Sequence, residues 1–151
     1  MSRRRDRRLM GRALALAASG YGRTGENPSV GCVICNREGV PIAEARTGDG
    51  GRPHAEEVAL DKAGEAARGG TAYVTLEPCR ERTSGAPSCS ERLIAAGLHR
   101  IVVAIRDEHP KGAGGLDRLA SAGLAIEVGL KARAAHALYR DFFEHAKSGQ
   151  N

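Results

Sequence analysis

His54, Glu56, Cys79 and Cys89 are the residues of this chain whose types and spacing most clearly suggest chemistry. One imidazole and two thiolates can hold a zinc ion through three protein ligands and leave the fourth coordination position open to water. An open position is typical of a catalytic zinc rather than of a closed structural one. Glu56 follows the histidine by two residues and is placed to move protons rather than to bind metal. The sequence therefore predicts a zinc site on His54, Cys79 and Cys89, with Glu56 as the catalytic proton carrier.

The chemistry that such a site favours is hydrolytic deamination. Zinc lowers the pKa of bound water from about 15.7 toward about 7, which makes a nucleophile available at neutral pH. The nucleophile can attack an electron-poor ring carbon that bears an amino group, while Glu56 moves protons and helps ammonia depart. His-x-Glu followed by Pro-Cys and a second Cys resembles the pattern of zinc-dependent nucleobase deaminases. Here nine residues, Arg80 to Ser88, separate the two cysteines instead of two.

Cys32 and Cys35 form a Cys-x-x-Cys, which invites a second metal or redox interpretation. They lie in a run of strand formers, and residues three apart on a strand point to opposite faces. We therefore expect two buried thiols that act as small hydrophobes. The alternative is a closed structural zinc site that takes one of them as its fourth ligand. Because we find no export signal, we expect thiols or metal ligands rather than disulfides.

The elements that must position these residues alternate between strand and helix. We expect helices over residues 6–19, 54–69, 89–97, 116–122 and 130–147, and strands over residues 30–35, 40–45, 71–76, 100–105 and 124–128. A hairpin followed by β-α-β units implies an α/β fold with a mixed five-stranded sheet and helices on both faces. His54 and Cys89 then open helices and Cys79 follows a strand, at the edge where open α/β sheets bind ligands.

Composition indicates one globular domain over residues 1–151, with 41% hydrophobic and 27% charged residues. The net charge of +5 comes from the first twelve residues, and the remainder is neutral. Residues 1–8 are predicted to be a basic, flexible arm. Arg12 interrupts the apolar stretch Leu9 to Ala18, which argues against a signal peptide. No segment approaches the ~20 apolar residues that cross a bilayer, so we expect a cytoplasmic protein without a membrane partner.

Five segments carry a resemblance to a known family: Asn27–Ile34 (NPSVGCVI), Pro53–Glu56 (PHAE), Thr71–Cys79 (TAYVTLEPC), Leu93–Gly97 (LIAAG) and Ala137–Phe143 (ALYRDFF). They resemble the deaminase domain of the bifunctional riboflavin-biosynthesis deaminase–reductase, within the cytidine deaminase-like superfamily, over nearly the whole chain. The resemblance implies a three-layer α/β/α sandwich and a homo-oligomer. It also implies Zn2+ on His54, Cys79 and Cys89, Glu56 as the proton shuttle, and Asn27 as a substrate contact. The implied reaction deaminates a diaminopyrimidinone that carries a ribosylamino phosphate.

Three departures from the family pattern fall on the substrate side. The loop Arg80 to Ser88 is one residue longer than usual and lacks a histidine, although Arg80 and Arg82 could bind a phosphate. Thr47 stands where the family has a histidine, and the loop Asp107-Glu108-His109-Pro110 is one residue shorter than usual. Because pocket contacts set which amine is accepted, we expect the reaction to be preserved and the specificity to be open to change.

Three other functions stay open. The departures favour a stand-alone relative that deaminates a different pyrimidine, purine or specialised-metabolite amine. A polynucleotide-editing or RNA-binding protein is disfavoured by the neutral body and by aromatic residues at only 3%. A zinc-stabilised structural protein would hold the metal without activity. The expected partner is thus a small amino-heterocycle, and nucleic acid is not expected.

Overall fold

A mixed five-stranded sheet forms the centre of the described chain. The computed structural model describes residues 3–80, 82, 85–108 and 113–147. The strands are β1 (Gly31–Cys35), β2 (Pro41–Arg46), β3 (Thr71–Leu76), β4 (Arg100–Ile105) and β5 (Ala125–Val128). They lie in the order β2-β1-β3-β4-β5. β1 runs antiparallel to β2 and β3, whereas β3, β4 and β5 are parallel, so the expected hairpin and β-α-β units are both present.

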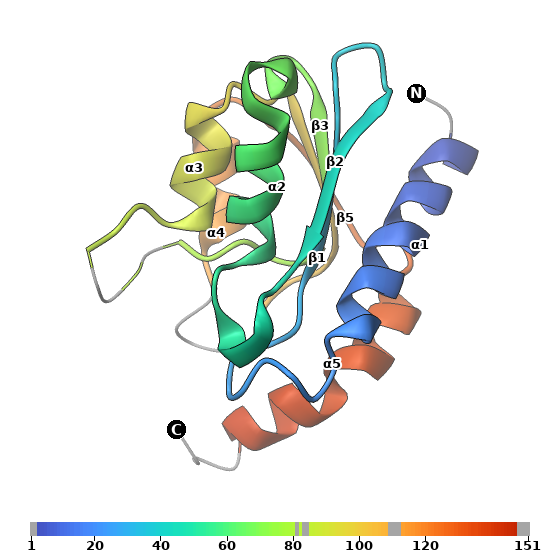
Figure 1. Ribbon diagram of the computed structural model, residues 1–151, viewed down its shortest axis with the longest axis vertical. Coiled ribbons are helices and arrows are strands. Elements are labelled where there is room, and N and C mark those ends of the chain that lie inside the picture. Colours follow the sequence, from blue (N-terminus) through green and yellow to red (C-terminus); the bar gives the residue numbers. More distant parts are fainter. Residues whose placement is uncertain (1–2, 81, 83–84, 109–112, 148–151) are drawn as a thin grey trace.

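Helices cover both faces of this sheet (Figure 1). The described α-helices are α1 (Arg3–Ser19), α2 (Ala55–Ala63), α3 (Cys89–Ala95), α4 (Gly115–Ser121) and α5 (Ala132–Lys147), and short 3-10 helices span Asp49–Gly51 and Gly64–Ala67. α2, α3 and α4 lie on one face, and α1 and α5 lie on the other. This arrangement is a three-layer α/β/α sandwich and confirms the predicted fold.

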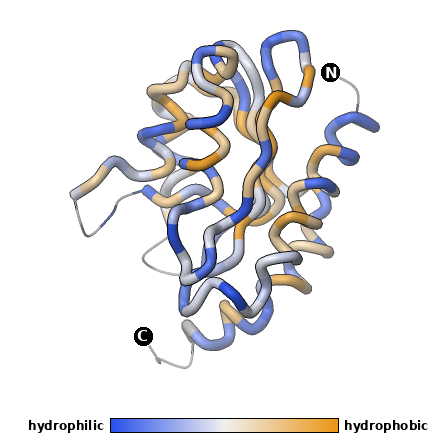
Figure 2. The backbone as a smooth tube through the Cα atoms, in the orientation of Figure 1, coloured by the Kyte–Doolittle hydropathy of each residue, from blue (hydrophilic) through white to orange (hydrophobic). Residues whose placement is uncertain are grey.

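The core lies along the central strands β1, β3 and β4. β1 and β3 are buried at every residue, and β4 at every residue after Arg100. Figure 2 shows the apolar residues concentrated along these strands and on the inner sides of the helices. The edge strands β2 and β5 are more exposed. A strand with helices on both faces needs apolar side chains in both directions, which explains the continuous apolar runs in the sequence.

α1 approaches β1 unusually closely at Gly31. A Cβ atom at this position would lie 1.9 Å from the carbonyl oxygen of Ala13, so no residue other than glycine fits without a shift of the backbone. The close approach allows α1 to bury Met10, Ala13 and Ala17 completely. The first helix is therefore an integral layer of the fold.

The structure corrects the basic, flexible arm predicted over residues 1–8, because α1 begins at Arg3. Asp6 provides the physical reason, since it is only 3% exposed. Its carboxylate accepts hydrogen bonds from the hydroxyl of Tyr73 at 2.6 Å and from two nitrogens of Arg100 at 3.1 and 2.8 Å. These bonds fasten the first turns of α1 to β3 and β4. Residues 1 and 2 lie outside the described part of the chain.

Two other predicted helix ends are also corrected. α2 ends at Ala63 rather than near residue 69, because Gly64 leaves the helical conformation with φ 57° and ψ −142°. α5 begins at Ala132 rather than at residue 130, because Lys131 adopts a left-handed φ of 57°. None of the described helices is both long enough and apolar enough to span a membrane.

Candidate metal centre and active site

His54, Cys79 and Cys89 come together at the ends of three elements. His54 caps the N-terminus of α2, Cys79 follows β3, and Cys89 is the first residue of α3. Their possible ligand atoms all lie within 4.8 Å of one another, and His54 Nδ1 is 3.2 Å from Cys89 Sγ. A tetrahedral ion with Zn–S near ~2.3 Å and Zn–N near ~2.0 Å needs ligand atoms about 3.5 to 4 Å apart. The three donors therefore fit a zinc ion in both type and spacing.

Cys79 and Cys89 are linked by hydrogen bonds. The backbone N–H of Cys89 donates to Cys79 Sγ at 3.2 Å. The hydrogen bond from the Cys89 side chain lowers the pKa of Cys79, with His54 assisting, although burial acts in the opposite direction. The same bond to Cys79, together with burial, raises the pKa of Cys89. Metal ligands are thiolates rather than thiols, so the lowered pKa of Cys79 favours the form that binds metal.

The two helices that carry ligands begin in the same way. Glu57 Oε1 accepts the backbone N–H of His54 at 3.3 Å. In α3, Glu91 Oε1 accepts the backbone N–H of Ser88 at 3.2 Å, and Ser88 Oγ accepts the N–H of Glu91 at 3.1 Å. Such reciprocal caps satisfy backbone donors that the first turn leaves free. They fix the backbone at His54 and directly before Cys89.

Glu56 lies in the first turn of α2 and is only 4% exposed. Burial is the main reason why its pKa rises to about 7, and the charge of Cys79 adds to the rise, while a backbone hydrogen bond and His54 oppose it. Glu56 is also close enough to raise the pKa of Cys89. A carboxylate with a pKa near the working pH can accept a proton and return it. The structure thus places a candidate general base within electrostatic range of the three donors.

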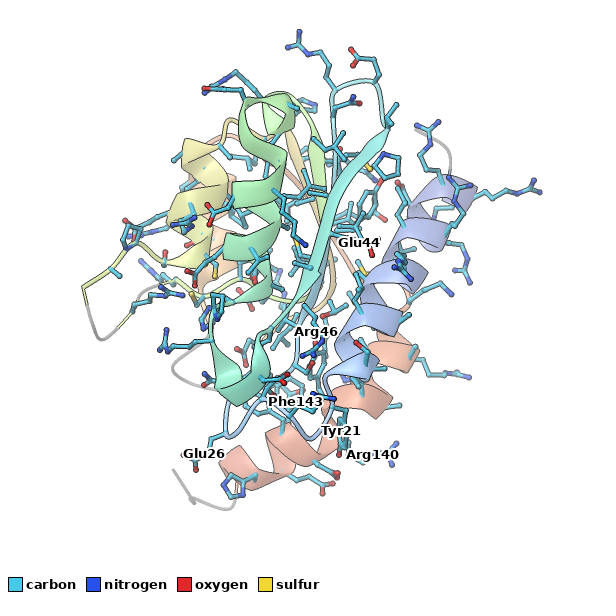
Figure 3. The ribbon with its side chains drawn as sticks, viewed as in Figure 1. Tyr21, Glu26, Glu44, Arg46, Arg140 and Phe143 are labelled. Atoms are coloured by element: carbon cyan, nitrogen blue, oxygen red, sulfur yellow. The ribbon has the colours of Figure 1, made fainter. Side chains whose placement is uncertain are left out.

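Asn27, the predicted substrate contact, lies in the loop between α1 and β1. Its side-chain amide donates to the carbonyl oxygen of Gly51 at 3.0 Å, three residues before His54. Asn27 also lines a cavity of about 440 Å³ between this loop and α5. Two other lining residues, Tyr21 and Glu26, are labelled on the same loop in Figure 3. The lining includes neither Glu56 nor any of the three candidate ligands, so we place the chemistry at the donor atoms and not in this cavity.

Thr47, which stands in place of a family histidine, has a structural role here. It is 2% exposed. Its hydroxyl accepts the N–H of Val30 at 2.9 Å and donates to the carbonyl oxygen of Pro28 at 3.3 Å. Thr47 therefore holds the backbone next to Asn27, and its hydroxyl is occupied by the main chain.

Of the two arginines considered for phosphate binding, Arg82 is already paired. It contacts the carboxylate of Glu57, and its side chain is only 11% exposed. Arg80 is exposed. The structure describes only part of the two loops that depart from the family pattern. Positions 81, 83, 84 and 109–112 lie outside the described residues.

Glu77 has a role that the sequence analysis did not assign. It is 6% exposed, and one carboxylate oxygen accepts the N–H of Asp107 at 3.0 Å. The other oxygen accepts the N–H groups of Gly114 at 3.2 Å and Leu116 at 3.0 Å. Glu77 thereby ties the end of β3, just before Cys79, to the loop after β4 and to the start of α4. The sequence does show a carboxylate directly after a buried strand. Because a buried charge needs hydrogen-bond partners, this position could have indicated the structural role of Glu77.

Cys32 and Cys35 are both fully buried in β1. Burial raises the pKa of both thiols, to about 11 for Cys35. Cys32 is influenced by the charge of Glu56, whereas Cys35 is influenced by those of Arg5 and Asp6, so the two thiols face different surroundings. Among the described residues, the group that could hold a metal contains neither of them. Their prediction as buried small hydrophobes is confirmed.

Comparisons with known proteins agree with this site. Residues 3–105 match the family described as the cytidine and deoxycytidylate deaminase zinc-binding region. The riboflavin biosynthesis protein RibD of Escherichia coli K12 is 44% identical over 145 residues, which cover 95% of this chain and 39% of RibD. The diaminohydroxyphosphoribosylamino-pyrimidine deaminase of Buchnera aphidicola subsp. Acyrthosiphon pisum is 39% identical over 141 residues, which cover 93% of this chain and 95% of that protein.

The solved structure of Acinetobacter baumannii RibD superposes with a TM-score of 0.88 at 40% identity, over 97% of this chain and 41% of that one. This chain thus spans about two fifths of the length of the RibD proteins that it matches. His54, Glu56, Cys79 and Cys89 all fall within the region that the family model covers. The resemblance found in the sequence is confirmed: the chain belongs to the zinc-binding cytidine and deoxycytidylate deaminase family, and the riboflavin-biosynthesis deaminases are among its relatives.

Proposed function

We propose that this chain is a zinc-dependent hydrolase that deaminates an amino-heterocycle, with the diaminopyrimidinone ribosylamino phosphate of riboflavin biosynthesis as the first candidate substrate. The observation that carries the proposal is the convergence of His54, Cys79 and Cys89 beside the buried carboxylate of Glu56. The Buchnera relative, which this chain matches over nearly its full length, supports the substrate, because its name describes a deaminase of that pyrimidine.

The donor set selects the kind of metal. Two thiolates and an imidazole suit zinc, whereas Mg²⁺ and Ca²⁺ prefer oxygen ligands. His54, Cys79 and Cys89 would hold the ion and leave one coordination position open. When bound there, zinc supplies the Lewis acidity that makes a water molecule nucleophilic near neutral pH.

Glu56 carries the protons of the reaction. Its carboxylate accepts a proton from water while the water oxygen forms a bond to the ring carbon that bears the amino group. Glu56 then gives this proton to the neighbouring ring nitrogen. In the second half it moves the remaining hydroxyl proton to the amine, so that the C–N bond breaks, ammonia leaves and a ring carbonyl remains. Its burial and its pKa of about 7 fit it for both directions of transfer.

A deaminase of a different heterocyclic amine is the second candidate, and two observations favour it. The hydroxyl of Thr47 is bonded to the main chain. The guanidinium of Arg82 is paired with Glu57. Two side chains on the expected substrate side therefore already have partners within the protein. A substrate without a phosphate would not need Arg82 as a phosphate ligand.

The test is a comparison of amines. Ammonia release by the zinc-loaded protein would be measured with the pyrimidine ribosylamino phosphate and with unphosphorylated pyrimidine and purine amines, in ¹⁸O-labelled water. Release from the phosphate compound, with label in the product, supports the first candidate. Release from an unphosphorylated amine alone supports the second. A folded, zinc-bound protein that releases ammonia from none of them would overturn the proposal.

Self-association and a cytoplasmic location belong to this proposal and stay predictions. The family resemblance motivates the first, and the bacterial biosynthetic relatives are consistent with the second.

A further inference from the structure

Glu57 and Arg82 form a largely buried ion pair beside the candidate metal centre. Arg82 Nη2 donates to Glu57 Oε1, and the two side chains are 11% and 18% exposed. Glu57 belongs to the first turn of α2, directly after Glu56. Arg82 belongs to the loop that begins at Cys79 and ends at Cys89. The pair thus joins the segment that carries one candidate ligand to the loop that lies between the other two.

The same carboxylate oxygen serves several contacts at once. Besides the guanidinium, Glu57 Oε1 accepts the backbone N–H of His54 at 3.3 Å and lies 4.0 Å from His54 Nδ1. Burial alone would lower the pKa of Arg82, but Glu57, and then Cys89 and Cys79, raise it. The guanidinium is therefore within the electrostatic surroundings of the candidate ligands. Since its loop begins and ends at two of these ligands, Arg82 belongs to the chain segment that joins them.

We propose that Arg82 is a positioning residue that acts through Glu57: their ion pair fastens the loop between the two cysteines to the first turn of α2 and holds it at the edge of the substrate site. The inference rests on the proposed deaminase function, because it assigns a role in the same site. The three candidate ligands are held by β3 and by the capped starts of α2 and α3. Loss of the pair should therefore leave zinc binding intact and weaken substrate binding.

The first test separates KM from kcat. Arg82→Gln removes the charge from the loop, and Glu57→Gln removes the charge from α2 while retaining an oxygen for the N–H of His54. We expect each to raise KM about tenfold, the order lost with one charge-assisted hydrogen bond, with kcat within about twofold of wild type. The double variant should be no worse than either single variant, because both remove the same interaction. Arg82→Lys, which restores a charged donor, should recover most of the loss.

Arg92→Gln provides a matched control. Arg92 is also an arginine paired with a carboxylate of α2, through Asp61 at 2.9 Å. Its Nε, like that of Arg82, is buried without a hydrogen-bond partner among the described residues. However, Arg92 lies within α3 rather than in the loop. Its substitution should leave KM unchanged.

A second readout does not depend on the substrate. Amide hydrogen exchange in peptides that cover Gly85 to Ser88 should be faster in Arg82→Gln and Glu57→Gln than in wild type, and unchanged in Arg92→Gln. If the wild-type protein deaminates none of the amines tested, the proposed function fails while exchange still tests the pair. Unchanged exchange, a loss of bound zinc, or a fall in kcat at constant KM would each overturn the positioning role.

Discussion

At the residue scale, the neighbouring residues Glu56 and Glu57 show how different surroundings shift the pKa of a carboxylate in opposite directions. Glu56 is buried, and its pKa rises to about 7. Burial is the largest single influence on the pKa of Glu57 and raises it, but the hydrogen bond and charge of Arg82 and the contacts with His54 together lower the pKa. One carboxylate can therefore exchange protons near neutral pH, and the other stays charged. The His-x-Glu pattern identifies Glu56 from the sequence, whereas the pairing of Glu57 with a residue 25 positions away becomes visible only in the fold.

Removal of one ligand should release the metal. In Cys89→Ala, two donors remain at the site, and zinc content after dialysis should fall from about one ion per chain to well below half, with loss of deaminase activity. The reason is that the variant loses one of the three possible ligand atoms, although the backbone N–H that donates to Cys79 Sγ is retained. Zinc would be measured by atomic absorption. Cys35→Ala is the control, because this thiol is buried in β1 outside the metal group. Equal zinc content in the two variants would contradict the assignment.

At the scale of elements, the sequence predicts where helices and strands lie better than it predicts the residues at which they begin and end. β3 and β4 match their predicted bounds, because each is an apolar run buried along the centre of the sheet. The ends of α2 and α5 do not match, since they depend on the backbone conformations of Gly64 and Lys131. Hydrophobic pattern reports burial, whereas a single left-handed φ is set by local packing. The three candidate ligands could be proposed from their residue types and spacing, and the structure brings them together at the end of such a strand and at the starts of two helices.

Gly31→Ala should destabilise the contact between α1 and β1. The new methyl group would meet the carbonyl oxygen of Ala13 at 1.9 Å. Overpacking of this kind lowers the free energy of unfolding by about 1 to 3 kcal/mol, which urea denaturation would measure. Gly11→Ala is the control within α1, because among the described residues outside its own helical backbone the added Cβ would meet only Lys131 Cε, at an ordinary 3.7 Å. That change should stabilise the helix by about 0.5 to 1 kcal/mol. Equal stability of Gly31→Ala and wild type would show that the close approach is not important.

At the scale of the whole molecule, the N-terminal arginines belong partly to the folded body. Arg3 pairs with Glu127 of β5, and Arg12 pairs with Glu44 of β2. Asp6, in the same helix, is held by Arg100. The sequence could not reveal these pairs, because charge patterning within twelve residues gives no information about partners 32 to 124 positions away. The basic cluster is therefore in part a surface of α1 that contacts the sheet.

Asp6→Asn should lower the free energy of unfolding at neutral pH and make that free energy depend less on pH in the acidic range. Hydrogen bonds from Arg100 and Tyr73 lower the pKa of Asp6, although burial opposes them. A carboxylate with a depressed folded-state pKa stabilises the fold above its unfolded pKa of about 3.9 and loses this contribution as the pH falls through the folded value. We expect a loss of about 3 kcal/mol at pH 7.

Urea denaturation of both proteins at several pH values would check this prediction. The difference between wild type and Asp6→Asn should shrink once the pH falls below about 4. A difference that stays constant with pH would contradict the role of the Asp6 carboxylate.

The central claim is that a zinc ion on His54, Cys79 and Cys89 and the carboxylate of Glu56 together deaminate a heterocyclic amine. Its most direct test measures zinc content and ammonia release in parallel for wild type and Glu56→Gln, with the amine that the wild-type protein turns over. We predict equal zinc content and a fall in kcat of about 10² to 10⁴-fold, the usual contribution of a general acid–base group. A Glu56→Gln variant that binds zinc and releases ammonia at the wild-type rate would contradict the account.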